Sequence, residues 1–194
     1  MADVHTPEQR SFNMSRIRGR DTKPELLLRR GLHARGFRFR LHRRDLPGRP
    51  DLVFPSRRAA IFVHGCFWHG HDCPMCRMPA TRPAFWRAKI EGNRLRDRKA
   101  VAALTAAGWR ALIVWECALR GPARQPEDEV LARCGQFLNS EFPQAELTGD
   151  WPERAGGIDG MSYSKVRETT GTDDAFRPLR RRVHHVPARP PRAV

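Results

Sequence analysis

The spacing of hydrophobic and polar positions predicts three helices in the central part of the chain. A capping box at residues 22–25 is followed by leucines at helical spacing, and the pattern ends at Gly36. A long helix is predicted over residues 83–107, because a proline opens this segment and a glycine directly follows it. The third helix is predicted over residues 127–137.

Short apolar runs predict the strands of a buried sheet. Residues 37–41 alternate strictly between hydrophobic and basic side chains, as a half-buried strand does. The runs 51–54 and 59–63 are separated by the turn-forming residues 55–58, and another buried strand is predicted over 109–116. Because these strands alternate with helices, we expect an α/β fold with a mixed central sheet.

The two ends of the chain differ from this central part. Thr6 and Pro7 can start a basic helix that runs to about Gly19. From about residue 150 the chain is rich in arginine and proline, without a periodicity that could bury a core. The predicted organisation is an N-terminal helix over 1–20, a single domain over 21–145 and a basic, disordered tail over 146–194.

Basic residues outnumber acidic ones. The chain has 36 Lys and Arg against 21 Asp and Glu, a net charge of +15, and residues 151–194, with nine basic and five acidic side chains, contribute only +4. The central part is therefore basic in itself, which favours a polyanionic partner, although charge alone does not separate DNA from RNA or acidic membranes. No apolar run approaches the ~20 residues of a membrane helix, and we expect a soluble, cytoplasmic protein.

The cysteines indicate a metal site rather than disulfides. Cys66, His71 and Cys73 share one short segment and Cys117 follows a later core strand, a combination of thiols and imidazole that suits zinc. The alternative is a group of buried thiols beside a surface histidine. The fourth ligand stays open at this point, because Cys73 also forms a C-x-x-C pair with Cys76.

A second candidate site is acidic. Asp51 begins one predicted strand and His64 follows the next, and such a pair at strand ends can hold Mg²⁺ against a phosphate. Glu25 and Asp97 lie on predicted helices and are candidates to complete the site. Each also has a simpler explanation: Glu25 belongs to the capping box, and Asp97 lies among arginines with which it can pair.

Large aromatic residues occur in a polar and basic part of the chain. Phe67 and Trp68 lie in the segment that carries the cysteines, and Trp86 lies near the start of the long helix. Such rings either cover the metal site or insert between DNA bases. Neighbouring side chains on a short loop seldom both point inward, which favours a role in DNA binding for Phe67 and Trp68.

Several motifs together resemble those of one nuclease family. In chain order they are Leu-Pro-Gly-Arg-Pro-Asp at 46–51, Phe-x-His-Gly-Cys-Phe-Trp-His at 62–69, Pro-Ala-Thr-Arg with Phe-Trp within 79–86, Gly-Trp-Arg at 108–110 and Val-Trp-Glu-Cys-Ala-Leu-Arg-Gly at 114–121. Over about residues 1–140 the chain resembles the very-short-patch-repair (Vsr) DNA endonucleases. The resemblance implies a restriction-endonuclease-like domain that uses Mg²⁺ to nick the T-containing strand 5′ of a T·G mismatch, the product of deaminated 5-methylcytosine.

The resemblance also implies roles for individual residues. Asp51 and the main-chain carbonyl of Val63 match the Mg²⁺ ligands. The other catalytic positions match Glu25, His64, His69 and Asp97. The ligands of a structural Zn²⁺ match Cys66, His71, Cys73 and Cys117, which leaves Cys76 outside the set. The DNA-binding positions match Met14 on the minor-groove side and a major-groove wedge made of Phe67, Trp68 and Trp86.

The partners that the resemblance implies are double-stranded DNA with a T·G mismatch, mismatch-repair proteins, a repair polymerase and a DNA cytosine methyltransferase, with the enzyme acting as a monomer. Two alternatives belong to other classes. One is a restriction-type nuclease that cuts both strands of a matched site. The other is a zinc-stabilised DNA-binding protein without catalysis. The tail receives no role beyond its charge.

Overall fold

A five-stranded mixed sheet forms the centre of the fold. The computed structural model describes residues 6, 8–9, 12, 16 and 19–151. The strands follow chain order across the sheet, with the pairs β1–β2 and β2–β3 antiparallel and the pairs β3–β4 and β4–β5 parallel. Their bounds are β1 Arg40–Leu41, β2 Leu52–Phe54, β3 Ala59–His64, β4 Arg110–Trp115 and β5 Gln144–Leu147.

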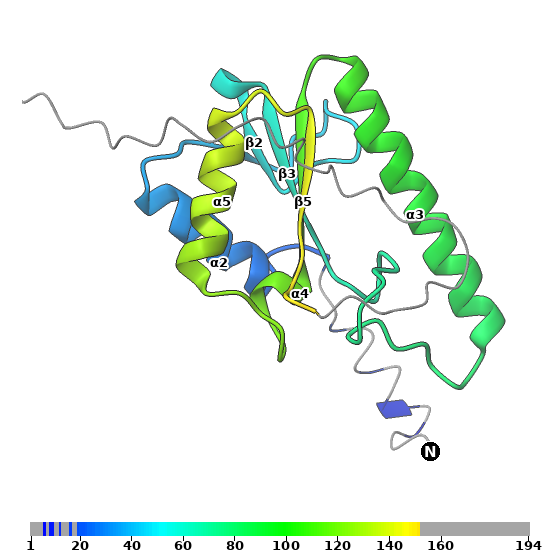
Figure 1. Cartoon of the computed structure of the whole chain (residues 1–194). Helices are drawn as coiled ribbons and strands as arrows, with labels where there is room; N and C mark the ends of the chain where they lie inside the picture. Colours follow the sequence, from blue (N-terminus) through cyan, green and yellow to red (C-terminus); the bar gives the residue numbers. More distant parts are fainter. Residues whose placement is uncertain (1–5, 7, 10–11, 13–15, 17–18, 152–194) are drawn as a thin grey trace, which may run out of the picture. The chain divides into compact units, whose positions relative to one another are not determined.

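Helices cover both faces of this sheet (Figure 1). On one face, α2 (Lys23–Ala34) and α5 (Glu127–Asn139) pack their leucines against β2, β3 and β4. On the other face, α3 (Pro83–Ala106) contributes Val101 and Leu104 to a second core cluster. Because both faces are covered, β2, β3 and β4 are almost continuously apolar rather than alternating.

The helix boundaries follow from local chemistry. At the start of α2 the Thr22 side chain accepts a hydrogen bond from the Glu25 N–H, and the Glu25 side chain accepts one from the Thr22 N–H. After α3, Gly108 adopts a φ of 73°, a left-handed conformation that glycine takes at little cost. The predicted helices over 22–36, 83–107 and 127–137 are therefore confirmed, and their observed ends lie within a few residues of the predicted ones.

The predicted strand over 37–41 is mostly wrong, because only Arg40 and Leu41 pair with β2. Phe37 and Phe39 are still half-buried, since both rings pack edge-on against Phe54. The alternation therefore reports correctly which side chains face the core, although most of the segment does not join the sheet.

Three short elements were not predicted, of which one is a 3-10 turn, η1 (Pro55–Arg57), between β2 and β3. A single helical turn, α4 (Glu116–Leu119), follows β4, and β5 forms an edge of the sheet. The predicted boundary at residue 145 falls within β5, and the described fold continues to Trp151, which packs against the second core cluster.

At the N-terminus, Glu8, Gln9 and Phe12 are helical, and Thr6 and Gln9 exchange the hydrogen bonds of a capping box. Residues 16, 19 and 20, near the predicted end of this helix, are in turns or bends. Met14 and the other undescribed residues of the predicted helix lie outside the described residues, as does the predicted tail from residue 152. No helix in the described part of the chain is long and apolar enough to cross a membrane.

Candidate active site and metal centre

Three thiols and one imidazole converge beyond the ends of β3 and β4. Cys66 and His71 follow β3, Cys73 lies two residues further on, and Cys117 lies in α4 directly after β4. One ligand atom from each of the four lies within 4.8 Å of all the others. The His71 Nδ1 atom is 3.6 Å from the Cys66 sulfur and 3.4 Å from the Cys117 sulfur. These separations fit a tetrahedral zinc ion, whose ligand atoms lie about 3.5–3.8 Å apart.

The electrostatics of this cluster also suit a cation. A hydrogen bond from the Cys66 thiol, together with His71 and the Gly149 N–H, lowers the pKa of Cys117 to about 4. The same hydrogen bond to Cys117, together with burial, raises the pKa of Cys66. Burial also raises the pKa of Cys73. Without a cation, Cys117 therefore loses its proton more readily than Cys66 and Cys73 do. A bound cation would stabilise the thiolate form of all three cysteines, which burial otherwise disfavours.

Sequence reasoning did not single out Gly149, which completes this cluster. Its N–H lies 3.2 Å from the Cys117 sulfur. A Cβ at this position would come within 2.5 Å of the Cys117 carbonyl oxygen and 2.7 Å of the Ala123 carbonyl oxygen. Only glycine lets the backbone approach the thiol this closely, but a glycine after a short polar strand carries no such signal in the sequence.

Asp51 directly precedes β2, at the end of the sheet where the neighbouring antiparallel strand β3 finishes. Its Oδ2 atom accepts a hydrogen bond of 2.7 Å from the Val63 N–H. Burial raises the pKa of Asp51, while Val63, His42, Arg29 and His69 lower it in part. The carboxylate is therefore held at a fixed position in surroundings that favour pairing with a cation.

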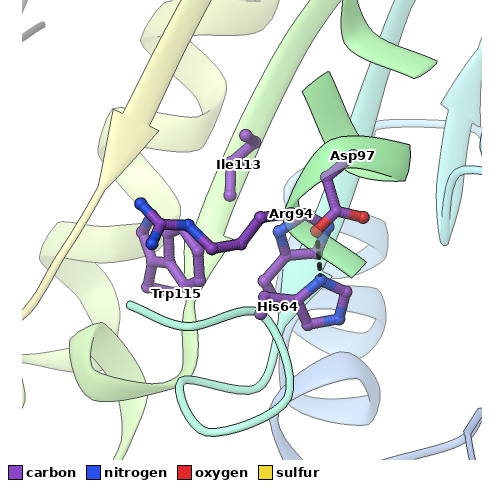
Figure 2. A pocket seen from close by; sticks show the side chains of 6 residues that line it. His64, Arg94, Asp97, Ile113 and Trp115 are labelled. Carbon is purple, nitrogen blue, oxygen red and sulfur yellow. Dashed lines mark hydrogen bonds and ion pairs between the residues drawn. The ribbon is translucent and has the colours of Figure 1, made fainter. Parts of the chain in front are cut away.

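Close to it, His64, His69 and Asp97 come together from β3, the following loop and α3. Figure 2 labels His64 and Asp97. The His69 Nδ1 atom is 2.6 Å from Asp97 Oδ2. An ionised carboxylate only accepts, so His69 carries a proton on Nδ1, and the neutral form of this tautomer has its lone pair on Nε2. Asp97 is thus a partner of His69 rather than of the neighbouring arginines.

The rings of His64 and His69 stack in parallel, with their centroids 3.8 Å apart and an interplanar angle of 5°. Nitrogen lone pairs lie in the ring plane, so the lone pairs of stacked rings run side by side and do not converge on one ion. This geometry suits proton transfer or orientation of a substrate better than joint metal binding. A cavity of about 10 Å³ beside them, lined also by Arg94 and Trp115, has room for about one water molecule (Figure 2).

Glu25 belongs to the capping box and to this site at once. Its side chain is almost fully buried, pairs with Arg29 and lies 3.2 Å from His42 Nε2. His42 in turn has its Nδ1 atom 3.7 Å from Asp51 Oδ1. Sequence reasoning missed Arg29 and His42, which connect Glu25 to Asp51.

The aromatic residues form a separate group. Ring centroids of Phe67, Trp68 and Trp86 lie 5.1–6.0 Å apart, and the Lys89 ammonium lies 5.7 Å from the Trp68 centroid and 5.8 Å from that of Trp86. All three rings are half-buried, and neither core cluster includes them. They pack on one another beneath a cation, on the same loop and helix that carry His69 and Asp97.

Comparison with known proteins identifies the family. A family profile described as "DNA mismatch endonuclease Vsr" matches residues 2–75. The "DNA mismatch endonuclease Vsr" of Escherichia coli is 45% identical over 147 residues, which cover 76% of this chain and 94% of that protein. The "Type II nicking enzyme V.XorIIP" of Xanthomonas oryzae pv. oryzae is 54% identical over 119 residues, covering 61% of this chain and 88% of that protein. The chain belongs to the Vsr family.

A Vsr protein is a DNA endonuclease, either of the mismatch or of the nicking type. Membership therefore removes the alternative of a DNA-binding protein without catalysis. Vsr nucleases typically need a divalent metal, and the Cys/His cluster is a possible metal site.

The structure brings the predicted residues of the Vsr motifs together in the aromatic group described above and in two further groups. One contains the four zinc-ligand candidates, and Cys76 is not a member of it. The other is formed by Asp51, Glu25, His64, His69 and Asp97, which converge from five segments of the chain. Met14 lies outside the described residues.

Proposed function

We propose that the protein is a Mg²⁺-dependent mismatch endonuclease that nicks the T-containing strand 5′ of a T·G mismatch and so initiates very short patch repair. The observation that carries this proposal is the fixed Asp51 carboxylate close to the His69–Asp97 pair, at the end of the sheet where β2 begins and β3 finishes. Asp51 can bind a cation and His69 can accept a proton, and metal-dependent hydrolysis of a phosphodiester uses both functions. The family supports a restriction-endonuclease-like description of the fold.

The residues around Asp51 fit a magnesium ion. In an extended strand the N–H and C=O of one residue point to the same side, so the Val63 carbonyl faces Asp51 as its N–H does. A carboxylate and a main-chain carbonyl are hard oxygen donors, which Mg²⁺ prefers, and the remaining ligands would be water and phosphate. When bound, Mg²⁺ neutralises negative charge on the phosphate and makes water more acidic.

We assign proton transfer and the positioning of the reacting groups to side chains of the protein. His69, whose Nδ1–H is held by Asp97, can accept a proton from the attacking water at Nε2. His64 stacks on His69 and keeps that ring in place, and Glu25 supports the site through its contacts with Arg29 and His42. In-line attack would leave a 5′-phosphate and a 3′-hydroxyl, which a repair polymerase can extend.

We assign mismatch recognition to the aromatic group. Phe67, Trp68 and Trp86 lie outside both core clusters, and Lys89 brings a positive charge to them. Aromatic rings that do not belong to the hydrophobic core and lie beside a positive charge can insert between DNA bases. Such insertion costs less free energy at a wobble pair than at a matched pair. Met14 would approach from the minor-groove side.

A structural zinc ion held by Cys66, His71, Cys73 and Cys117 would join the loop after β3 to α4. Four protein ligands would fill all the positions of a tetrahedral zinc ion, which is typical of a structural rather than a catalytic site. The functional partners we propose are mismatch-repair proteins, a repair polymerase and a DNA cytosine methyltransferase, with the enzyme acting as a cytoplasmic monomer.

Nicking of end-labelled duplexes tests this function. With Mg²⁺ we expect one product from the T strand of T·G duplexes, much less from U·G or matched C·G duplexes, and none without metal. Asp51→Asn should lower the nicking rate by at least about a thousandfold, because the carboxylate is removed as a ligand, and should still bind the mismatch.

A plasmid with one T·G mismatch distinguishes the proposed strand-nicking enzyme from the alternative of a restriction-type nuclease. A strand-nicking enzyme converts it to the open-circular form, whereas a restriction-type enzyme that cuts both strands produces linear DNA. Full activity of Asp51→Asn, or equal rates on T·G and C·G duplexes, would contradict the proposal.

A further inference from the structure

A buried ion pair lies behind the catalytic carboxylate. Arg29, on α2, donates a hydrogen bond of 2.6 Å from one terminal guanidinium nitrogen to Asp21 and one from the other terminal nitrogen to Glu25. The Arg29 side chain is 12% exposed and that of Glu25 is 2% exposed. The same guanidinium nitrogen that bonds Glu25 also lies 2.8 Å from His42 Nε2.

These contacts assign the proton of His42. A guanidinium group only donates, so the contact with Arg29 makes His42 Nε2 an acceptor. The terminal nitrogen of Arg29 has two hydrogens, one for Glu25 and one for His42, which explains why Glu25 also lies 3.2 Å from His42 Nε2. With Nε2 as the acceptor, the ring carries a proton on Nδ1, which lies 3.7 Å from Asp51 Oδ1.

Each oxygen of Asp51 therefore has a neighbouring N–H of this chain, one at hydrogen-bond distance and one at ion-pair distance. Oδ2 accepts the Val63 N–H, and Oδ1 faces the His42 N–H. His42 itself has a φ of 47°, in the left-handed region, immediately after β1. A residue without the freedom of glycine keeps such a conformation only where its surroundings impose it, and here Arg29 contacts the ring directly.

We propose that His42, oriented by Arg29, is a positioning residue that fixes the Asp51 carboxylate for divalent-metal binding. Arg29 sets the tautomer of His42, and His42 presents an N–H to the carboxylate oxygen that Val63 leaves unoccupied. This inference rests on the proposed role of Asp51 as the Mg²⁺ ligand.

Asp21, Glu25 and His42 also satisfy the spacing of a metal site, with ligand atoms within 4.8 Å of one another. Arg29 already pairs with both carboxylates of this group. A metal ion there would have to displace a guanidinium that is only 12% exposed, so this cluster is better described as a support for Asp51 than as a second metal site.

Direct measurement of Mn²⁺ binding tests the proposal. Mn²⁺ takes the oxygen ligands that Mg²⁺ takes, and electron paramagnetic resonance reports its free concentration. We would titrate Mn²⁺ into the full-length protein bound to a pre-nicked T·G duplex, which cannot be cut again at that site. His42→Leu should weaken the Asp51-dependent Mn²⁺ site by about ten- to a hundredfold, as is typical when a residue that orients a metal ligand is removed.

His42→Gln is the conservative variant. A glutamine amide has an acceptor for Arg29 and a donor for Asp51, so its Mn²⁺ affinity should stay within about threefold of the wild-type value. Arg29→Gln should weaken the site as His42→Leu does, and the double variant should be no weaker than the more affected single variant, because both act through one interaction. His33→Leu, an exposed histidine on the same helix as Arg29, is the matched control and should leave Mn²⁺ binding unchanged.

The outcomes separate this proposal from the proposed function. If Asp51→Asn binds Mn²⁺ as tightly as the wild type, the metal role of Asp51 is wrong. If Asp51→Asn loses the site while His42→Leu keeps wild-type affinity, only the role of His42 is overturned. If glutamine fails as leucine does, with thermal unfolding of both variants unchanged, the donor and acceptor argument is overturned.

Discussion

His64 is the most deeply buried histidine of the active site, and its burial decides which of its protonation states can take part. Its side chain is 5% exposed, and its Nδ1 atom has no hydrogen-bond partner in the part of the chain that the structure describes. Burial, and secondarily the nearby His69, lowers the pKa of His64 to about 3. The ring is therefore neutral at physiological pH and cannot neutralise a phosphate, which leaves packing against His69 as its clearest contribution.

Replacing His64 should change how stability depends on pH. The unfolded chain binds a proton at this residue below a pKa of about 6.5, whereas the folded chain binds it only below about 3, so stability falls as pH drops through this window. Between pH 6.5 and 5 the wild type should lose about 1.5 kcal/mol of unfolding free energy through this residue alone. His64→Asn should remove that loss, measured by urea unfolding at both pH values. The exposed His33→Asn should keep the wild-type difference, and an unchanged difference in His64→Asn would contradict the assigned burial effect.

At the scale of elements, the sequence predicts what local periodicity and caps determine. α2, α3 and α5 are long and have recognisable ends, and β2, β3 and β4 are apolar because both faces of the sheet are covered. β5 and α4 were missed because each has only four residues, and β5 has just one buried position. Their positions are fixed by pairing with β4 and packing on α5, which are properties of the assembled fold.

The same limit applies to the active site. Asp51, His64 and the cysteines occur in dense, unusual patterns that a sequence displays. Arg29 looks like any basic residue on a helix surface, and His42 lies in an irregular segment after two strand residues. Their roles appear only when α2 is placed beside the start of β2, because the contacts join residues 13 and 9 positions apart along the chain.

The loop between β3 and α3 gives a prediction at this scale. Cys66, Cys73 and Cys117 are buried in the cluster that joins this loop to α4, whereas Cys76 lies outside it. Purified wild type and Cys76→Ser should each contain one zinc ion per chain by mass spectrometry of the metal. Cys66→Ser should lose the zinc and about 4 kcal/mol or more of unfolding free energy, because removal of a structural metal is among the largest single-residue effects. Equal zinc content in Cys66→Ser and Cys76→Ser would exclude the proposed ligand set.

At the scale of the whole molecule, the two sites are physically connected. Trp115, at the end of β4, stacks on His71 with ring centroids 4.2 Å apart and contacts the His64 ring edge-on at 5.3 Å. Its Nε1 donates a hydrogen bond of 2.9 Å to Glu146 on β5. The zinc cluster and the catalytic histidines therefore share one packing unit, so that loss of zinc should disturb the His64–His69 stack as well as the loop.

The positive charge of the chain is divided between the central part and the tail, and removal of the tail tests what its share does. The last described residue, Trp151, packs on the core, so a chain ending there keeps the whole described fold while losing nine basic and five acidic residues. We expect an unchanged unfolding temperature and an unchanged preference for T·G over C·G duplexes, because no residue of either site is removed.

Affinity of the shortened chain for matched DNA should fall. The slope of log K against log salt between 50 and 200 mM should become shallower by roughly 0.9 for each phosphate group that the tail neutralises in the full chain. Fluorescence anisotropy measures both quantities. A slope identical to that of the full chain would show that the basic tail binds no phosphate groups and that the central part alone accounts for the electrostatic attraction to DNA.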